Sequence, residues 1–105
     1  MPKLLRLCAK ADVPTDRALQ VRLPNGEALA VCQAEGAFYA VADTCSHGLA
    51  SLSEGEVVGN EIYCPFHGGA FDIRTGKATE RPCTIAIATY SIVQEGDALS
   101  VEVAE

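Results

Sequence analysis

Apolar and polar residues alternate in short runs along much of this chain, and turns rich in glycine and proline separate the runs. Alternation with a period of two is typical of β-strands that bury one face, whereas helical periodicity is weak throughout. The pattern predicts strands at residues 3–8, 19–23, 28–33, 38–41, 84–91 and 99–103. Residues 11–14 are predicted to form a single helical turn that ends at Pro14, because proline cannot continue a helix.

Asn25-Gly26 lies between two alternating runs, which is a strong signal for a β-hairpin. We expect the return strand of this hairpin to place Leu29 and Val31 on one face. In the last strand Ser100 occupies a polar position between apolar ones, so we expect it on the opposite face from them. These features predict a meander of antiparallel strands.

The pattern changes between residue 45 and about residue 79, where glycine is dense. Short apolar pieces alternate there with turns, and they lie at 57–58, 61–63 and 70–73. Residues 72–77 are predicted to close this region with a hairpin. We therefore expect a single all-β domain with an antiparallel, sandwich-like base and a small insert that follows about its fifth strand. The insert covers approximately residues 43–80, and the base covers residues 1–42 and 81–105.

Composition and charge restrict the function of the chain. At 105 residues it is long enough for one domain with its own core, and its formal net charge is −6 with a pI of about 4.8. Nucleic-acid binding is disfavoured, because no basic patch could neutralise phosphates, and basic protein partners are expected instead. No apolar run is long enough to cross a membrane, and Arg6 and Lys10 interrupt the apolar N-terminal residues. We expect a monomer in the cytoplasm with no membrane or nucleic-acid partner.

The chain contains five cysteines, and three of them lie outside the motifs described next: Cys8, Cys32 and Cys83. An odd remainder argues against a framework of disulfides and agrees with a reducing compartment. Cys8 and Cys32 fall within apolar runs, so we expect them to be small buried side chains.

Two short motifs contain both histidines of the chain, and sixteen residues separate them. The motifs are Cys45-Ser46-His47 and Cys64-Pro65-Phe66-His67. Two thiolates and two imidazoles can close a tetrahedral zinc site, and they can also hold a [2Fe–2S] cluster on mixed ligands. A metal-free set of core residues is a third, less natural interpretation.

The pairing of ligand types favours the iron–sulfur cluster. Zinc fingers usually take their cysteines from one segment and their histidines from another, whereas each motif here supplies one of each. Two matched loops could therefore place Cys45 and Cys64 on one iron and His47 and His67 on the other. A glycine follows each histidine and would let backbone amides approach the sulfurs.

The pattern C-x-H-x16-C-x2-H followed by Gly-Gly closely resembles the signature of Rieske iron–sulfur proteins. Within that family the chain looks most like the free-standing ferredoxins of bacterial aromatic-ring-hydroxylating dioxygenase systems. The stretches that carry this likeness are residues 44–48, 51–55, 64–72 and 75–78. The resemblance implies a Rieske fold whose insert binds one [2Fe–2S] cluster through Cys45, His47, Cys64 and His67.

The resemblance also implies a function. Such a ferredoxin carries single electrons from an NAD(P)H-dependent flavoprotein reductase to a terminal oxygenase and is not itself an enzyme. The Rieske domain of an oxygenase α subunit fits less well, because its mononuclear iron needs two further histidines that this chain lacks. Two more functions would suit the same four ligands: a Rieske-like small subunit of a reductase such as assimilatory nitrite reductase, and a zinc-stabilised interaction domain.

Departures from the respiratory and photosynthetic Rieske proteins refine this assignment. Those proteins brace the cluster with a disulfide, and the corresponding positions here are Ala50 and Phe66. They also donate hydroxyl hydrogen bonds to the cluster and a ligand sulfur from positions that correspond to Gly69 and Phe71. They carry a membrane anchor as well, which we do not expect in this protein. The resemblance therefore implies a soluble ferredoxin of low potential. In residues 81–83 it implies a proline that shields the cluster and a nearby cysteine that is not a ligand.

Overall fold

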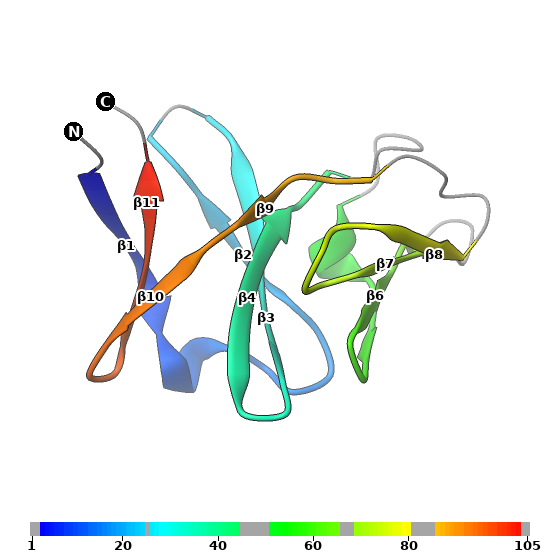
Figure 1. The fold of residues 1–105 in the computed structure, drawn as a ribbon, viewed down its shortest axis with the longest axis horizontal. Coiled ribbons are helices and arrows are strands. Elements are labelled where there is room, and N and C mark those ends of the chain that lie inside the picture. The colour runs from blue at the N-terminus through cyan, green and yellow to red at the C-terminus, as the bar shows by residue number, and fades with distance from the viewer. Residues whose placement is uncertain (1–2, 25, 45–50, 66–68, 81–85, 104–105) are drawn as a thin grey trace.

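The computed structural model describes residues 3–24, 26–44, 51–65, 69–80 and 86–103, whose strands form three antiparallel sheets (Figure 1). The first sheet, in the order β1-β11-β10, contains β1 (Lys3–Ala9), β10 (Ile92–Glu95) and β11 (Ala98–Val103). The second, in the order β2-β3-β4-β9, contains β2 (Leu19–Arg22), β3 (Ala28–Ala34), β4 (Ala37–Ala42) and β9 (Thr89–Tyr90). The third contains β5 (Val57–Val58), β6 (Glu61–Tyr63), β7 (Ala70–Asp72) and β8 (Ala78–Glu80), in that order. We call the first two the base sheets and the third the small sheet.

The prediction of an all-β chain with an insert of short strands is confirmed, with corrections at three places. The insert follows the fourth strand rather than about the fifth. The helical turn is a 3₁₀ turn, η1 (Lys10–Asp12), which begins one residue early because the Asp12 carboxylate accepts a hydrogen bond from the Ala9 amide at 3.0 Å. The strand predicted at 84–91 is largely wrong in its described part, because pairing with β4 is limited to Thr89 and Tyr90.

The hairpin predicted between the second and third strands is present. β2 and β3 pair antiparallel from Arg22↔Ala28 onward, and the Leu23 amide donates to the Glu27 carbonyl oxygen at 2.7 Å. Gly26 has φ +92°, a left-handed conformation that glycine adopts without steric cost. Asn25 lies outside the described residues.

β3 is buried on both of its faces, which its alternating pattern does not reveal. Leu29 and Val31 share one face as predicted, and they pack in clusters with Leu99 and Val101 of β11. The other face carries Ala30, Cys32 and Ala34, and these side chains pack in one cluster with the small sheet. The small sheet therefore shares its core with the base through one strand.

The alternating pattern also does not reveal that Ser100 is buried, with 5% of its surface exposed. β11 is the central strand of its sheet, and Ser100 lies opposite Arg6 on one side and Val93 on the other. Residues directly opposite each other project on the same face, so two larger side chains flank the small serine.

The described residues contain no helix with the length and apolar character needed to span a bilayer.

Candidate cluster-binding site

Cys64 is the predicted ligand that the structure describes, while Cys45, His47 and His67 lie outside the described residues. Cys64 directly follows β6 and is 3% exposed. Its amide donates to the Gly69 carbonyl oxygen at 2.6 Å, a bond that closes the base of the second motif loop. Its side chain belongs to the core cluster that includes Ile62 and Phe71. The second loop therefore starts from a fixed, buried thiol.

The base of the first motif loop is closed in a similar way. Thr44 and Ser51 form an isolated antiparallel bridge at the two ends of residues 45–50. Next to this bridge, the Leu52 amide donates to the Asp43 carbonyl oxygen at 2.6 Å. The Asp43 amide in turn donates to the Ala28 carbonyl oxygen of β3 at 3.0 Å. Backbone hydrogen bonds thus tie both ends of the loop to each other and to the second base sheet.

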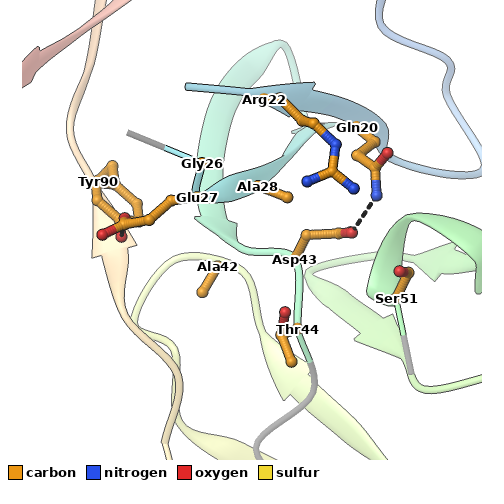
Figure 2. A pocket seen from close by; sticks show the side chains of 10 residues that line it. All are labelled: Gln20, Arg22, Gly26, Glu27, Ala28, Ala42, Asp43, Thr44, Ser51 and Tyr90. Atoms are coloured by element: carbon orange, nitrogen blue, oxygen red, sulfur yellow. Dashed lines mark hydrogen bonds between the residues drawn. The ribbon is translucent and has the colours of Figure 1, made fainter. Parts of the chain in front are cut away.

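The Asp43 side chain adds two further hydrogen bonds at the same place, and Figure 2 shows the one with Gln20. It is 1% exposed, and its Oδ1 accepts a hydrogen bond from the Ser53 amide at 2.7 Å. Its Oδ2 accepts a hydrogen bond from Nε2 of Gln20 in β2, also at 2.7 Å. Asp43 and Gln20 line a surface pocket of about 390 Å³ whose other polar walls include Arg22 and Tyr90. Both oxygens of a buried carboxylate are therefore satisfied by protein donors.

Gly55 connects the two motif loops. It caps the 3₁₀ turn η2 (Leu52–Glu54), and its amide donates to the Leu52 carbonyl oxygen at 2.9 Å. A Cβ at Gly55 would overlap the backbone carbonyl oxygen of Tyr63, the residue before Cys64. The backbone after the first loop therefore packs directly against the backbone that leads into the second.

Gly76 fastens a third segment to the small sheet. Its φ is +80°, and a Cβ there would overlap the carbonyl oxygen of Ile87. The Ile87 amide also donates to the Gly76 carbonyl oxygen at 2.9 Å. The chain is therefore fixed to the small sheet at Ile87, while Pro82 and Cys83 lie outside the described residues.

Two thiols outside the predicted ligand set are buried, as the pattern predicts. Burial, and secondarily the charge of Asp43, raises the pKa of the Cys32 thiol to about 12. Burial likewise raises the pKa of Cys8. Cys8 and Cys32 are free thiols in the described part of the chain and remain protonated at neutral pH.

The described residues fit a site built on the two motif loops. Among them no three histidine, cysteine or acidic side chains gather as a metal site. Both histidines of the chain and Cys45 belong to the motif loops and lie outside the described residues. Leu52, which follows the first loop, and Cys64, which begins the second, lie in one core cluster. Soft thiolates and imidazoles presented from two joined loops suit an iron–sulfur cluster.

A model of the Rieske [2Fe-2S] domain matches residues 3–91 of the chain. The chain belongs to the Rieske [2Fe–2S] family. It is 46% identical over 101 residues to the ferredoxin component of the p-cumate 2,3-dioxygenase system of Pseudomonas putida, covering 95% of this chain and 86% of that protein. The predicted Rieske-type [2Fe–2S] cofactor is thereby confirmed, and the zinc interpretation is set aside.

Solved structures of Rieske ferredoxins match the whole fold. The Sphingomonas yanoikuyae B1 ferredoxin superposes with a TM-score of 0.93 at 38% identity, covering 97% of this chain and 100% of that one. A complex of reduced oxygenase and oxidized ferredoxin in carbazole 1,9a-dioxygenase matches with a TM-score of 0.87 at 39% identity, covering 93% and 91%. A putative NADH-dependent nitrite reductase small subunit from Mycobacterium tuberculosis is 19% identical with a TM-score of 0.85, which shows a shared fold alone.

These comparisons confirm a Rieske-type ferredoxin that transfers electrons and is not a catalyst. The sequence pattern did not reveal the residues that hold the Rieske loops: Gln20, Asp43 and Gly55. Asp43 lies two residues before the first motif and Gly55 follows an acidic turn, but neither position forms a metal-ligand pattern. Their roles depend on burial and on backbone packing across the fold.

Proposed function

We propose that Cys45, His47, Cys64 and His67 are the ligands of the Rieske cluster in this chain. The observation that carries the assignment is the position of Cys64, which is buried at the closed base of the second motif loop. Its side chain lies in one core cluster with Leu52, which follows the first motif loop. When bound, a Rieske cluster accepts and releases one electron. The deep position of Cys64 supports cysteine ligation of the inner iron and histidine ligation of the outer one.

We further propose that the chain carries these electrons from an NAD(P)H-dependent flavoprotein reductase to a terminal aromatic-ring-hydroxylating oxygenase. The support is the set of relatives, which are named as ferredoxin components of dioxygenase systems, together with the solved complex of such an oxygenase and its ferredoxin. The likeness to a nitrite reductase small subunit is too low to favour that function.

The proposed division of the chain into two parts follows the arrangement of the sheets. We propose residues 43–80 as the cluster-binding subdomain and residues 1–42 and 81–105 as the base domain that supports it. We also propose that the protein is soluble and works in the cytoplasm as a monomer; its relatives are named as ferredoxins or ferredoxin components of dioxygenase systems.

The partner-docking face is proposed at the tip formed by the two motif loops. Pro65 is exposed there, next to buried Cys64, and Gly48, Leu49, Phe66 and Pro82 of the proposed apolar rim lie outside the described residues. Glu54 and Glu56 are exposed on the same subdomain. Charges in such positions steer basic partners at long range and are screened by salt, so electron transfer to the oxygenase should slow as ionic strength rises.

The test begins with the purified protein. It should be red-brown and contain two irons and two acid-labile sulfides per chain, with the low average g value of a histidine-ligated Rieske centre in its reduced form. His47→Ala and His67→Ala should each abolish this signal, whereas an exchange outside the ligand set, Cys8→Ala, should leave it intact. A colourless protein that contains zinc would refute the ligand assignment.

The electron-carrier role has its own test. With NADH, a flavoprotein ferredoxin reductase and a terminal Rieske oxygenase, turnover of the aromatic substrate should depend on the loaded ferredoxin. Protein with an intact cluster that cannot be reduced by the reductase, or cannot reduce the oxygenase, would refute the proposed partners without affecting the ligand assignment.

A further inference from the structure

The buried Asp43 carboxylate is a feature that neither the ligand motif nor the family's electron-carrier role explains. It is one of the two buried polar side chains among the described residues, and the other, Ser100, lies in a base sheet. Burying a carboxylate is costly unless hydrogen bonds compensate it, so a chain retains such a group where its bonds fix a structure.

Asp43 joins three separate segments at the point where the first ligand loop departs (Figure 2). Its backbone amide bonds to Ala28 of β3, and its side chain bonds to Gln20 of β2. On the far side of the loop, its carbonyl oxygen and Oδ1 accept hydrogen bonds from the Leu52 and Ser53 amides at 2.6 and 2.7 Å. The residue before the loop therefore holds the residues after it, and both are anchored to the second base sheet.

We propose that Asp43 is a positioning residue for the Rieske cluster, and that its two side-chain hydrogen bonds hold the ends of the loop that carries Cys45 and His47. The inference rests on the proposed assignment of Cys45 and His47 as ligands. Residues that hydrogen-bond to the ligand-bearing groups without touching the metal fix the orientation of the ligands. Their removal typically lowers metal affinity about 10–100-fold.

The backbone bonds alone leave the loop less constrained. The bridge between Thr44 and Ser51 and the bond from Leu52 to Asp43 set the separation of the two ends. With so few backbone hydrogen bonds, the two ends of the loop can still rotate together relative to the second base sheet. The Asp43 side chain accepts hydrogen bonds from two different segments, the Ser53 amide after the loop and Gln20 of β2. These two bonds fix the angle between the ends of the loop and the second base sheet.

Asp43→Ala removes both side-chain bonds while leaving the backbone bonds in place. The reduced holoprotein should show shifted or broadened g values, and the loaded protein should lose iron to a chelator about tenfold faster or more. Asp12→Ala is the matched control, because the Asp12 carboxylate also accepts a backbone hydrogen bond, but at η1 in the base. It should leave the g values and the rate of iron loss unchanged.

Asp43→Asn separates hydrogen bonding from charge. The asparagine oxygen can accept from the Ser53 amide, and its NH₂ can donate to Gln20 once that exposed amide turns its oxygen inward. We expect this variant to restore the g values and most of the slow iron loss. If Asp43→Asn behaves like Asp43→Ala, positioning by hydrogen bonds is overturned.

Gln20→Leu provides a variant that folds even if Asp43→Ala does not, because Gln20 is exposed on the edge strand β2. It should accelerate iron loss by a few-fold with unchanged far-UV circular dichroism. Wild-type g values and iron retention in Asp43→Ala, or in Gln20→Leu where Asp43→Ala does not fold, overturn the inference. Absence of a cluster from the wild-type protein would instead refute the ligand assignment.

Discussion

Most strands of the base sheets are four to seven residues long, whereas the strands of the small sheet are two or three residues long. Strands this short bury few side chains of their own, and the small sheet compensates by packing Ile62 and Phe71 in one core cluster with one face of β3. It is also fastened by close backbone contacts at Gly55 and Gly76. The base is held by side-chain burial, whereas the small sheet relies on a core that it shares with β3 and on close backbone contacts.

The difference shows how a chain can keep ligand loops in place without a large core of their own. Backbone contacts define the position of a loop more narrowly than flexible side chains do, since the peptide unit is rigid. The two regions should accordingly fail in different ways when they are perturbed, and the following predictions test this from the largest effect to the smallest.

Leu29→Ala should produce the largest loss of stability. Leu29 is fully buried between β3 and β11, and removing a buried leucine side chain costs about 2–5 kcal/mol in the free energy of unfolding. Thermal and denaturant unfolding measure this loss. The control is Leu4→Ala at a position that is 44% exposed, where the change should stay within about 0.5 kcal/mol. If Leu29→Ala lost as little stability as the control, side-chain burial would not be what stabilises the base sheets.

Gly55→Ala should damage the cluster more than the base. The added Cβ overlaps the Tyr63 carbonyl oxygen and must push apart the backbones that lead from and into the two motif loops, at a cost of about 1–3 kcal/mol. We expect poor incorporation of iron, measured as iron per chain, with β-sheet circular dichroism largely retained.

Gly59→Ala, in the turn between β5 and β6, is the matched control. Gly59 has φ +60° and no atom near its missing Cβ, so alanine there meets backbone strain but no clash. It should lower stability by about 1 kcal/mol while leaving the iron content unchanged. Equal iron loss in both variants would show that the close backbone contact at Gly55 is unimportant.

The reduction potential offers a more specific test of the proposed cluster site, with a smaller expected effect. Gly69 and Phe71 are buried and carry no hydroxyl, so neither side chain can donate a hydrogen bond to the cluster or its sulfur ligands. A donor stabilises the extra charge of the reduced state, so Gly69→Ser and Phe71→Tyr should each raise the potential by some tens of millivolts (~59 mV corresponds to ~1.4 kcal/mol for one electron). Voltammetry on protein with intact clusters measures the shift, and an unchanged double variant would point to solvent exposure as the cause of a low potential.

The smallest expected effect concerns acid stability of the small sheet. Side-chain hydrogen bonds from Arg74 hold the pKa of the Asp72 carboxyl below its ordinary range. A carboxyl whose pKa is depressed by folding stabilises the folded state above its unfolded pKa of about 3.9, and this contribution is lost as the pH falls through the lower, folded value. Asp72 and Arg74 are partly exposed, so the effect is small.

Asp72→Asn tests this pH dependence. Its thermal midpoint should fall below that of the wild type at about pH 6, and the difference should shrink as the pH approaches about 3. Asp97→Asn removes an exposed carboxylate from the turn before β11 and is the control. A difference for Asp72→Asn that stays constant with pH would show that the pair with Arg74 does not act through ionisation.

Much of the fold and the family could be predicted from the sequence, because strand alternation and the spacing of the two cysteine–histidine motifs are local features. The double burial of β3 and the burial of Ser100 could not, because alternation tells which side chains share a face and not what covers that face. The hydrogen bonds of the Asp43 side chain could not be predicted for a similar reason, since its donors lie 23 residues before it and 10 residues after it. Distances of this kind are set by the folded chain.

The pairing of the first and last strands has a practical consequence. β1 and β11 pair from Lys3↔Val103 onward, and Figure 1 places both ends of the described chain at the opposite end of the molecule from the small sheet. A linker, a surface tether or a second protein could therefore be joined at either end without covering the region of the ligand loops. Two copies fused in tandem, or one copy attached to an electrode through its last strand, would each leave the small sheet uncovered.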